Sequence, residues 1–499
     1  MSSSLSAPTE PQNKRATASG VAQNKPVAAV IPLVPAWRVD HTFDYAVPAE
    51  LIDALEPGSL VRVPFGGRRV RAVVTTIEER TPDRALETIA GVVTAAPVAP
   101  PPMVDVFDWI ARRYVTPRGK AFARAVPSRV RVRVDALPPL PQDPSPDLVG
   151  SYAGGTEMIA AIEKRDPDIW CFECLPTHDR SRLIAELVAA AGRGGDGTAL
   201  VCVPEVRYGS LVLDGLDKWM TAPARVDSAQ SEADRSRSLL ALAAGRGVGA
   251  GGRAALLAPA RGLRLIVVDE EPHRSYKEDR SPRYDARRLA IHRARLSGAV
   301  CVLMGTTLSV ESGAAARTGE FGWVTPGRRE RRDARPVVEF AERDEGSSLS
   351  RLLHGRIKDV LASGGRTALL APAAGYSRAV WCVQCRRSLR CDVCEAGMFF
   401  DRATGRRLSR LRCPRCSNTE SPPEACPNCG GTDFRWLGAG SERLAEQLQK
   451  AFPRALVVRA DPDDLEASTE RALQADIYVT TWIGTKASLR PEVSLVGVI

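Results

Sequence analysis

The sequence predicts an α/β protein with a small β-rich module at the N-terminus and two regions of alternating strands and helices, the second interrupted by a cysteine-rich insertion. Three observations support this prediction. Residues 27–94 alternate between apolar and polar positions, as strands with one buried face do. Short, continuously apolar runs follow from residue 166, as in parallel strands covered on both faces. Eight closely spaced cysteines lie between residues 382 and 429.

Length and charge bound the class of protein. The 499 residues correspond to three domains of about 150 residues each. The net charge of +10 favours polyanionic partners, nucleic acid before an anionic membrane. No run of 18 apolar residues occurs, which excludes a transmembrane helix, and residues 1–26 lack the apolar core of a signal peptide. We therefore expect a disordered tail over 1–26, a cytoplasmic protein and no membrane partner.

The first folded region is predicted over residues 27–125. Its strand-like runs are separated by turns at Pro57-Gly58 and Gly66-Gly67, and apolar residues recur at helical spacing after residue 103. A proline-rich stretch at 137–146 then predicts a linker, which we place at 126–165.

Two α/β lobes are predicted after the linker. The first covers residues 166–325, with apolar strand-like runs at 198–204, 263–269 and 299–305. Such strands, alternating with helices, are typical of a parallel sheet. The second lobe begins over 326–380, is interrupted by the cysteine-rich module over 381–435, and resumes over 436–499.

Eight of the twelve cysteines form four C-x2-C pairs and are predicted to hold two structural zinc ions. Each pair can place two thiolates on one ion, and two pairs complete a tetrahedral site with no open position for catalysis. Iron–sulfur ligation and a redox thiol pair are the alternatives. The candidate ligands are Cys382, Cys385, Cys391, Cys394, Cys413, Cys416, Cys426 and Cys429. We interpret the other four, Cys171, Cys174, Cys202 and Cys301, as buried apolar thiols.

An acidic pair follows the apolar run 263–268. Asp269 and Glu270 form a Walker-B pattern, and in active NTPases such acids hold Mg²⁺ and polarise the attacking water. Together with Arg283-Tyr284 and the sequence Leu-Met-Gly-Thr-Thr at 303–307, this stretch is similar to motifs II and III of a superfamily 2 helicase. The similarity implies RecA-like lobes.

Nearly the whole chain resembles the family of primosomal protein N′ (PriA), the replication restart helicases. Four blocks carry the resemblance in the family's order: residues 42–45 with 61–66, residues 267–307, the eight-cysteine insertion preceded by Gly375-Tyr376, and residues 438–443 with 480–496. The resemblance implies that the insertion pairs its cysteines in nested fashion. Cys382 and Cys385 would share one zinc ion with Cys426 and Cys429, and the four inner cysteines would share the other.

The resemblance also implies a pocket for a DNA 3′ end in the first module, formed by Phe43, Asp44, Tyr45 and Gly66. An aromatic platform suits this task because stacking tolerates any base. A carboxylate would accept a hydrogen bond from a 3′-hydroxyl and repel an internal phosphate. A basic residue of the family's pocket is not matched in the sequence.

The nucleotide site departs from the family's pattern. A P-loop reads G-x-x-x-x-G-K-[ST], whereas residues 175–181 read Leu-Pro-Thr-His-Asp-Arg-Ser. Without glycines the loop cannot easily aim its amides at phosphates, and Pro176 removes a donor. The chain also stops before motif VI, whose arginines would contact the ATP phosphates. We therefore expect neither bound ATP and Mg²⁺ nor enzymatic activity. The residues of this degenerate nucleotide site are Arg180, which replaces the lysine, Ser181, in the Mg²⁺-ligand position, Asp269 and Glu270.

The predicted function is that of a replication restart protein without helicase activity, which recognises stalled or branched forks and recruits the replicative helicase machinery. The expected partners are branched DNA with a 3′ end, primosome and helicase-loading proteins, and single-stranded-DNA-binding protein. One alternative is an active ATP-dependent 3′→5′ DNA helicase with a divergent P-loop. Another is a zinc-dependent transcription or chromatin regulator.

Overall fold

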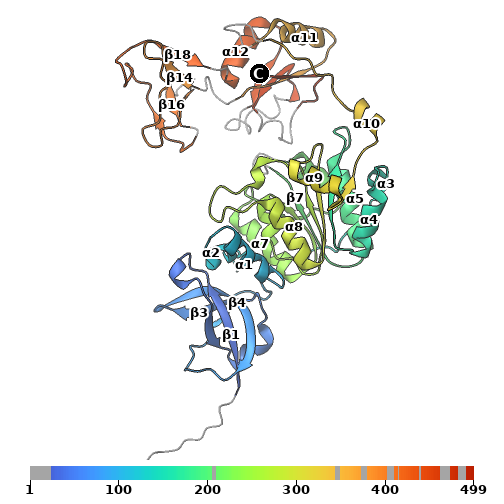
Figure 1. Cartoon of the computed structure of the whole chain (residues 1–499), viewed down its shortest axis with the longest axis vertical. Coiled ribbons are helices and arrows are strands. Elements are labelled where there is room, and N and C mark those ends of the chain that lie inside the picture. Colours follow the sequence, from blue (N-terminus) through green and yellow to red (C-terminus); the bar gives the residue numbers. More distant parts are fainter. Residues whose placement is uncertain are drawn as a thin grey trace, which may run out of the picture.

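The computed structural model describes residues 24–204, 210–342, 349–372, 379–401, 409–413, 415–437, 440–460, 473–481 and 491–499. Its parts follow one another along the long axis of the molecule in chain order (Figure 1). Most of the tail expected over 1–26 lies outside the described residues, but Lys25 and Pro26 already belong to the first strand. Among the described residues, no helix combines the length and apolarity needed to cross a bilayer.

The N-terminal module is a five-stranded antiparallel sheet in the order β2-β1-β4-β3-β5. Its alternating sequence buries one face as a core that includes Val30, Val61 and Val74. The hairpin between β3 and β4 turns at Gly66 and Gly67, whose φ values of 56° and 76° require the left-handed region. The strands are β1 (Lys25–Pro32), β2 (Phe43–Ala46), β3 (Leu60–Phe65), β4 (Arg68–Arg80) and β5 (Gly91–Val92).

Two helices, α1 (Met103–Arg113) and α2 (Arg118–Phe122), join this module to the first lobe. Phe107 and Ile110 of α1 are buried in one core that reaches from Leu60 in the module to Ile266 in the first lobe. Because one apolar core spans both parts, the module and the lobe form a continuous unit.

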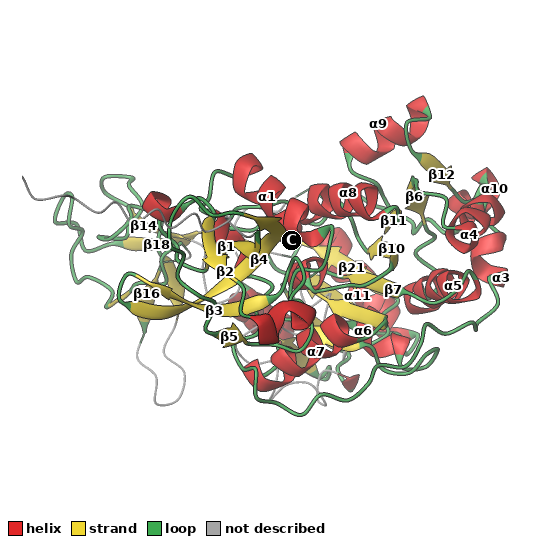
Figure 2. Cartoon of the chain, turned by 90° about the horizontal axis from the view of Figure 1, so that it is seen from below, coloured by secondary structure: helices red, strands yellow, loops and turns green. Residues whose placement is uncertain are grey.

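The first lobe is built on a seven-stranded parallel sheet in the order β12-β6-β11-β10-β7-β9-β8. Alternate residues of its central strands enter different cores, with Leu265 packing toward one face and Ile266 toward the other. Figure 2 shows the central strands between helix α8 and helix α5. The predicted parallel sheet with two covered faces is confirmed. The strands are β6 (Ile169–Glu173), β7 (Thr198–Cys202), β8 (Ala224–Val226), β9 (Gly247–Gly251), β10 (Leu263–Val268), β11 (Val300–Gly305) and β12 (Gly322–Val324).

The helices of this lobe are α5 (Arg180–Arg193), α6 (Leu211–Leu216), α7 (Glu232–Ala244), α8 (Ala286–Ser297) and α9 (Val310–Thr318). Two further helices, α3 (Asp147–Gly150) and α4 (Gly155–Lys164), lie where the sequence predicted a linker. Buried Glu186 of α5 accepts hydrogen bonds from the amides of Leu148 and Val149 and so fixes α3 to the lobe. The predicted linker over 126–165 is therefore too long, because prolines masked a short helical hairpin.

The first lobe also extends past its predicted end at residue 325. In helix α10 (Arg328–Asp333), Arg331 forms an ion pair with Glu173 of β6 at 2.8 Å. This contact attaches α10 to the first lobe, so the start of the second lobe lies later than residue 326.

The second lobe contains a four-stranded parallel sheet in the order β19-β20-β13-β21. Its core includes Ile357, Leu369 and Leu444. Its elements are α11 (Arg351–Ala362), β13 (Thr367–Leu370), α12 (Ser441–Ala451), β19 (Val457–Ala460), β20 (Ile477–Thr480) and β21 (Leu495–Val498).

The cysteine-rich module is inserted between β13 and α12, as predicted. It consists of the antiparallel pair of β14 (Ala379–Cys382) and β18 (Phe434–Leu437), and of a three-stranded sheet of β15 (Phe399–Asp401), β16 (Arg410–Arg412) and β17 (Thr419–Glu420). These short strands bury few apolar residues, so the module needs support beyond its own core.

Candidate functional sites

The residues predicted to bind a DNA 3′ end lie on the edge strand β2 and divide between its two faces. Phe43 is half-buried, and its ring meets Phe65 of β3 edge-on at a centroid distance of 5.0 Å. The ring of His41 also contacts Phe43, at a centroid distance of 4.2 Å. Phe43 therefore presents part of an aromatic surface close to the hairpin turn that contains Gly66.

Asp44 points to the opposite face of β2, since successive strand residues alternate. Its carboxylate lies 2.6 Å from the guanidinium of Arg80, at the end of β4, and both side chains are more than a third exposed. The hydrogen bond to Asp44 raises the pKa of Arg80 above its usual value. Arg80 supplies a basic group that the sequence did not assign, because 35 residues separate it from Asp44 in the chain and only the strand order brings them together.

Tyr45 does not join these exposed groups. It is buried in the core of the module, and its hydroxyl donates a hydrogen bond to the carbonyl of Pro64 at 2.6 Å. Burial raises the pKa of Tyr45. The expectation that Tyr45 lines a pocket for a terminal base does not fit this position, because its ring is enclosed by protein.

The eight clustered cysteines form two groups of four, and the sulfur atoms of each group lie within 4.8 Å of one another. One group contains Cys382, Cys385, Cys426 and Cys429, and the other contains Cys391, Cys394, Cys413 and Cys416. The nested pairing is thus confirmed. Contacts between pairs range from 3.4 Å, between Cys394 and Cys413, to 3.7 Å, between Cys385 and Cys426. A tetrahedral ion with Zn–S bonds of about 2.3 Å requires sulfurs about 3.7 Å apart, so the groups fit zinc.

The four C-x2-C loops share one turn geometry. In each loop, the amide of the residue after the second cysteine donates to the carbonyl of the first cysteine, at 2.8 to 3.1 Å. That residue has a positive φ in every loop: 56° at Arg386, 59° at Glu395, 62° at Ser417 and 73° at Gly430. A left-handed conformation costs about 1–2 kcal/mol for a residue other than glycine. A metal ion held by each cluster would stabilise these turns in a module whose own core is small.

The remaining cysteines are buried, as predicted. Cys171, Cys174, Cys202 and Cys301 lie within the first lobe and are at most 2% exposed. Burial raises the pKa of the Cys171 and Cys174 thiols to about 12 and that of Cys202 and Cys301 further still. A thiol in this state is a poor nucleophile and a poor metal ligand, because both roles need the thiolate.

We expect these four thiols to resist alkylation in the folded protein. At pH 8, a thiol with a pKa of about 12 is ionised to about one part in ten thousand, and a reagent cannot reach it without local opening. Mass-mapped labelling with iodoacetamide should leave all four unmodified in the native chain and modify them after denaturation. Rapid native labelling of Cys174 would contradict the interpretation.

The motif II acids meet Arg180 at the carboxyl ends of the parallel strands. Asp269 and Glu270 follow β10, and Arg180 begins α5 after the loop from β6. One guanidinium nitrogen of Arg180 lies 2.8 Å from Glu270 and 3.3 Å from Asp269. Asp269 is almost fully buried, and the side chains of Arg180 and Glu270 are 24% and 19% exposed. The guanidinium of Arg180 therefore occupies the position next to both carboxylates, where a metal ion would otherwise bind.

Electrostatics keep Arg180 charged in this position. Burial alone lowers the pKa of Arg180, but the charges of Asp269 and Glu270 outweigh burial and raise it above its usual value. Ser181 contacts different groups: its hydroxyl and its amide both donate to Asp179, at 2.6 Å and 2.9 Å. Ser181 is buried beneath Gly215 of α6, where a Cβ would approach its hydroxyl to 2.5 Å. Of the four residues expected at one nucleotide site, Arg180, Asp269 and Glu270 thus form an ion-pair cluster, whereas Ser181 takes part in the N-terminal cap of α5.

A second acid of the same loop, Glu271, ties the end of β10 to the segment after β11. Glu271 is fully buried and accepts a hydrogen bond from the amide of Ser309 at 2.5 Å, and it also faces Arg287 of α8 at 3.4 Å. The sequence analysis did not single out Glu271. Glu271 follows two other acids in the sequence, which is the one local sign of a role. Its contact with the segment after β11 depends on the pairing of β10 with β11.

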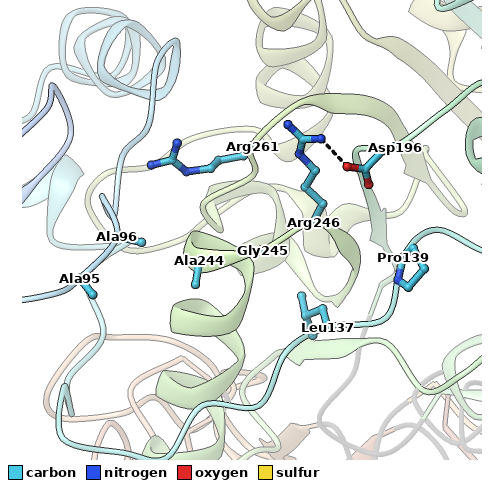
Figure 3. A pocket seen from close by; sticks show the side chains of 9 residues that line it. All are labelled: Ala95, Ala96, Leu137, Pro139, Asp196, Ala244, Gly245, Arg246 and Arg261. Atoms are coloured by element: carbon cyan, nitrogen blue, oxygen red, sulfur yellow. Dashed lines mark hydrogen bonds and ion pairs between the residues drawn. The ribbon is translucent and has the colours of Figure 1, made fainter.

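The cleft drawn in Figure 3, with a volume of about 720 Å³, lies away from these acids. Arg246 precedes β9, Asp196 precedes β7 and Arg261 precedes β10, so the cleft opens at the amino ends of the strands, whereas Asp269 follows the carboxyl end of β10. Ligands of parallel α/β sheets bind at the carboxyl ends. Both arginines are also paired, Arg246 with Asp196 and Arg261 with Glu56. The cleft is therefore not a displaced nucleotide site.

Comparison with known proteins agrees with the sites described above. Residues 29–127 match a family model described as the 3′ DNA-binding domain of PriA. The chain is 32% identical over 263 residues to replication restart protein PriA of Bacillus subtilis, a match that covers 50% of this chain and 32% of that protein. It is 29% identical over 454 residues to the probable replication restart protein PriA of Mycobacterium tuberculosis (strain CDC 1551 / Oshkosh), which covers 86% of this chain and 67% of that protein.

A third relative, replication restart protein PriA of Treponema pallidum, is 26% identical over 483 residues and is matched over 72% of its length. These matches span from about a third to nearly three quarters of the relatives' own lengths. A solved structure of a Saccharomyces cerevisiae Dbp5 variant bound to RNA and ADP BeF3 covers 75% of this chain and 70% of that chain at 11% identity, with a TM-score of 0.26.

The fold and the sites define an α/β protein with two parallel sheets, an N-terminal β module that matches a 3′ DNA-binding domain, and an insertion with two cysteine clusters that could each hold a metal ion. More narrowly, residues 29–127 match the 3′ DNA-binding domain of PriA, and the chain is similar to replication restart protein PriA of several bacteria along most of its length.

Proposed function

We propose that this protein recognises branched DNA carrying a 3′ end at stalled replication forks and supports restart of replication without hydrolysing ATP. The match of residues 29–127 to a 3′ DNA-binding domain supports the first part. The ion pairs of Arg180 with Asp269 and Glu270 support the second. Recruitment of primosome proteins, of the loaders of the replicative helicase and of single-stranded-DNA-binding protein belongs to the same proposal.

The 3′ end would bind at the edge strand β2. Phe43 offers a half-exposed ring on which a base of any kind can stack. Asp44 accepts from Arg80 in the free protein and can accept from a 3′-hydroxyl as well, because a carboxylate has several acceptor positions. Arg80 then stands where it can pair with the phosphate next to the terminal sugar, so the two side chains together favour an end that carries a hydroxyl.

The absence of ATP turnover would follow from Arg180. In an active site, Mg²⁺ stands between the motif II acids and the β- and γ-phosphates. Here the guanidinium of Arg180 already pairs with Asp269 and Glu270, and the loop before α5 contains a proline but no glycine. Nucleotide would have to displace an ion pair without the amide cradle that normally compensates.

The two clusters of four cysteines would hold two zinc ions with a structural role. The thiolates of each cluster fill a tetrahedral shell, so zinc there would position the surrounding turns and would not activate water. Amide-to-sulfur contacts in the C-x2-C loops, such as that of Val393 with Cys391 at 3.4 Å, would stabilise the thiolates around such an ion, and elemental analysis distinguishes zinc from iron.

The experiment that tests the proposed DNA role compares forks that differ only at the 3′ end. We expect the native protein to bind a fork with a 3′-hydroxyl at least tenfold more tightly than the same fork with a 3′-phosphate. Phe43→Ala together with Asp44→Ala should abolish this preference, because the stacking surface and the hydroxyl acceptor are both lost. Fluorescence anisotropy at fixed salt measures both affinities.

Tyr45→Phe is the matched control for this experiment. It removes only a buried hydroxyl, so it should lower stability by about 1 kcal/mol and leave the 3′-end preference intact. The pocket assignment is wrong if the double variant still distinguishes the two ends, or if Tyr45→Phe loses the preference while remaining folded.

A further inference from the structure

The outer face of the β3–β4 hairpin gathers arginines that have no acidic neighbour in sequence. Residues 60–77 contain four arginines and no acid. Residues 112–134, which begin with the last two residues of α1, contain seven arginines, one lysine and no acid. In a chain with 59 acidic residues, two such stretches mark a basic surface.

The structure brings these two stretches together. A guanidinium nitrogen of Arg71, on β4, donates a hydrogen bond to the carbonyl of Pro127 at 3.1 Å. Residues 128–134 continue from this point toward α7, where the amide of Arg129 donates to the hydroxyl of Ser236. The hairpin and the arm after α2 therefore form one surface that reaches from the N-terminal module to the first lobe; β3, β4, α2 and α7 are labelled in Figure 1.

Strand register places the hairpin arginines on one face. Arg62 of β3 lies directly opposite Arg71 of β4, and Pro64 lies opposite Arg69. Directly opposed residues share a face, and so do residues two apart along a strand, so Arg62, Arg69 and Arg71 project the same way. Like charges directly opposite one another destabilise a sheet, so the pair of Arg62 and Arg71 lowers the stability of the free protein.

The charges on this surface are available to a ligand. Arg62, Arg69, Arg129 and Arg131 are exposed, and in the described part of the chain none of their guanidinium groups forms an ion pair or a hydrogen bond. In contrast, Arg80 and Arg261 of the same region are paired with acids. A row of unpaired guanidinium groups suits the regularly spaced phosphates of a nucleic-acid backbone, which each can accept a forked pair of hydrogen bonds.

We infer that this surface, which we call the arginine track and define as Arg62, Arg69, Arg129 and Arg131, binds the phosphate backbone of duplex DNA independently of the 3′-end site. This inference deepens the proposed function, because it names the part of a fork that the module would hold beside the end. The track reads no sequence, since phosphate contacts carry none. It would contribute the salt-dependent part of the affinity.

The test uses a blunt duplex of twenty base pairs whose 3′ ends are both phosphorylated, so that no 3′-hydroxyl is present. For each phosphate contact, the slope of log affinity against log salt steepens by about 0.9. The variant R62Q/R69Q/R129Q/R131Q should therefore show a slope shallower by about 3 to 4 than the native protein. Its binding at low salt should weaken at least a hundredfold.

The matched control is R328Q/R329Q/R332Q/R335Q, which removes the same charge from exposed positions at and after α10. Its salt slope should change by less than one. Because Arg62 and Arg69 project from the face of the hairpin opposite to Phe65, which Phe43 contacts, the track variant should still prefer a 3′-hydroxyl fork over a 3′-phosphate fork. Failure of that preference in the native protein would contradict the proposed function but leave the track untouched.

Two outcomes would overturn the inference. One is a track variant whose slope on the blunt duplex equals that of the native protein or of the control. The other is a variant that keeps duplex binding but loses binding to a polyglutamate peptide, which would assign the surface to an acidic protein partner.

Discussion

Replacing Arg180 with alanine is expected to destabilise the first lobe by about 3 kcal/mol, because removal of one partner from a mostly buried ion pair leaves the other charges uncompensated. Asp269 and Glu270 would then face each other without a cation. For a lobe of this size, the loss corresponds to a melting temperature lower by about 6–12 °C. Circular dichroism during heating measures the shift.

The same variant should acquire a response to magnesium. With Arg180 gone, the two carboxylates form a site for a hard cation, so millimolar Mg²⁺ should raise the melting temperature of Arg180→Ala. The native protein should not respond, because its own guanidinium occupies the position. Arg329→Ala is the control: its side chain is 88% exposed, and its removal should change stability by less than about 0.5 kcal/mol. An unchanged melting temperature of Arg180→Ala would mean that the ion pair carries no weight in the folded state.

Loss of one metal ion should have the second large effect. Cys394→Ser together with Cys413→Ser removes two ligands of the inner cluster, and the content measured by elemental analysis should fall from two zinc ions per chain to one. Binding of a structural zinc ion is worth roughly 10–16 kcal/mol in small modules. Loss of that energy should release the left-handed turns at Glu395 and Ser417 and unfold the surrounding strands.

Cys301→Ser is the matched control for the zinc experiment. Cys301 is a fully buried cysteine of the first lobe and belongs to neither cluster, so this variant should keep two zinc ions. Hydrogen exchange should report faster exchange over residues 379–437 in the double variant and no change there in Cys301→Ser. Iron in the native protein, or two zinc ions in the double variant, would contradict the assignment.

Patterns that depend on local spacing were predictable from the sequence. The two four-cysteine sites followed from the C-x2-C spacing, with their nested pairing implied by the resemblance to the PriA family, and the parallel sheet followed from apolar runs such as 263–268. In both cases, one physical requirement, four sulfurs around an ion or burial of a strand on both faces, fixes the residue types at short range.

Features that depend on contacts distant in sequence were not predictable. Arg80 meets Asp44 only because β2 and β4 both pair with β1, one on each side of it. Arg180 was interpreted as a poor substitute for a lysine, whereas the structure shows it paired with acids about ninety residues away. Tyr45 was predicted to line the 3′-end pocket, but its side chain packs in the core of the module.

Helix α4 was hidden for a different reason. Prolines at 138–146 favoured a linker over the whole interval, although apolar residues such as Met158 and Ile162 recur at helical spacing beyond them. A proline disfavours the helix only at nearby positions. The proline-rich composition of 138–146 therefore did not apply to the residues that follow.

Steady-state phosphate release in the presence of forked DNA tests whether this chain hydrolyses ATP. The native chain is compared with Asp269→Asn/Glu270→Gln, which lacks both motif II acids, under the same concentrations of ATP and Mg²⁺. Because Arg180 pairs with both acids and the loop before α5 lacks the glycines of a phosphate cradle, we expect equal rates for the two proteins, with no stimulation by the fork. A native rate clearly above that of the double variant and increased by forked DNA would contradict it and would identify the chain as an active helicase motor.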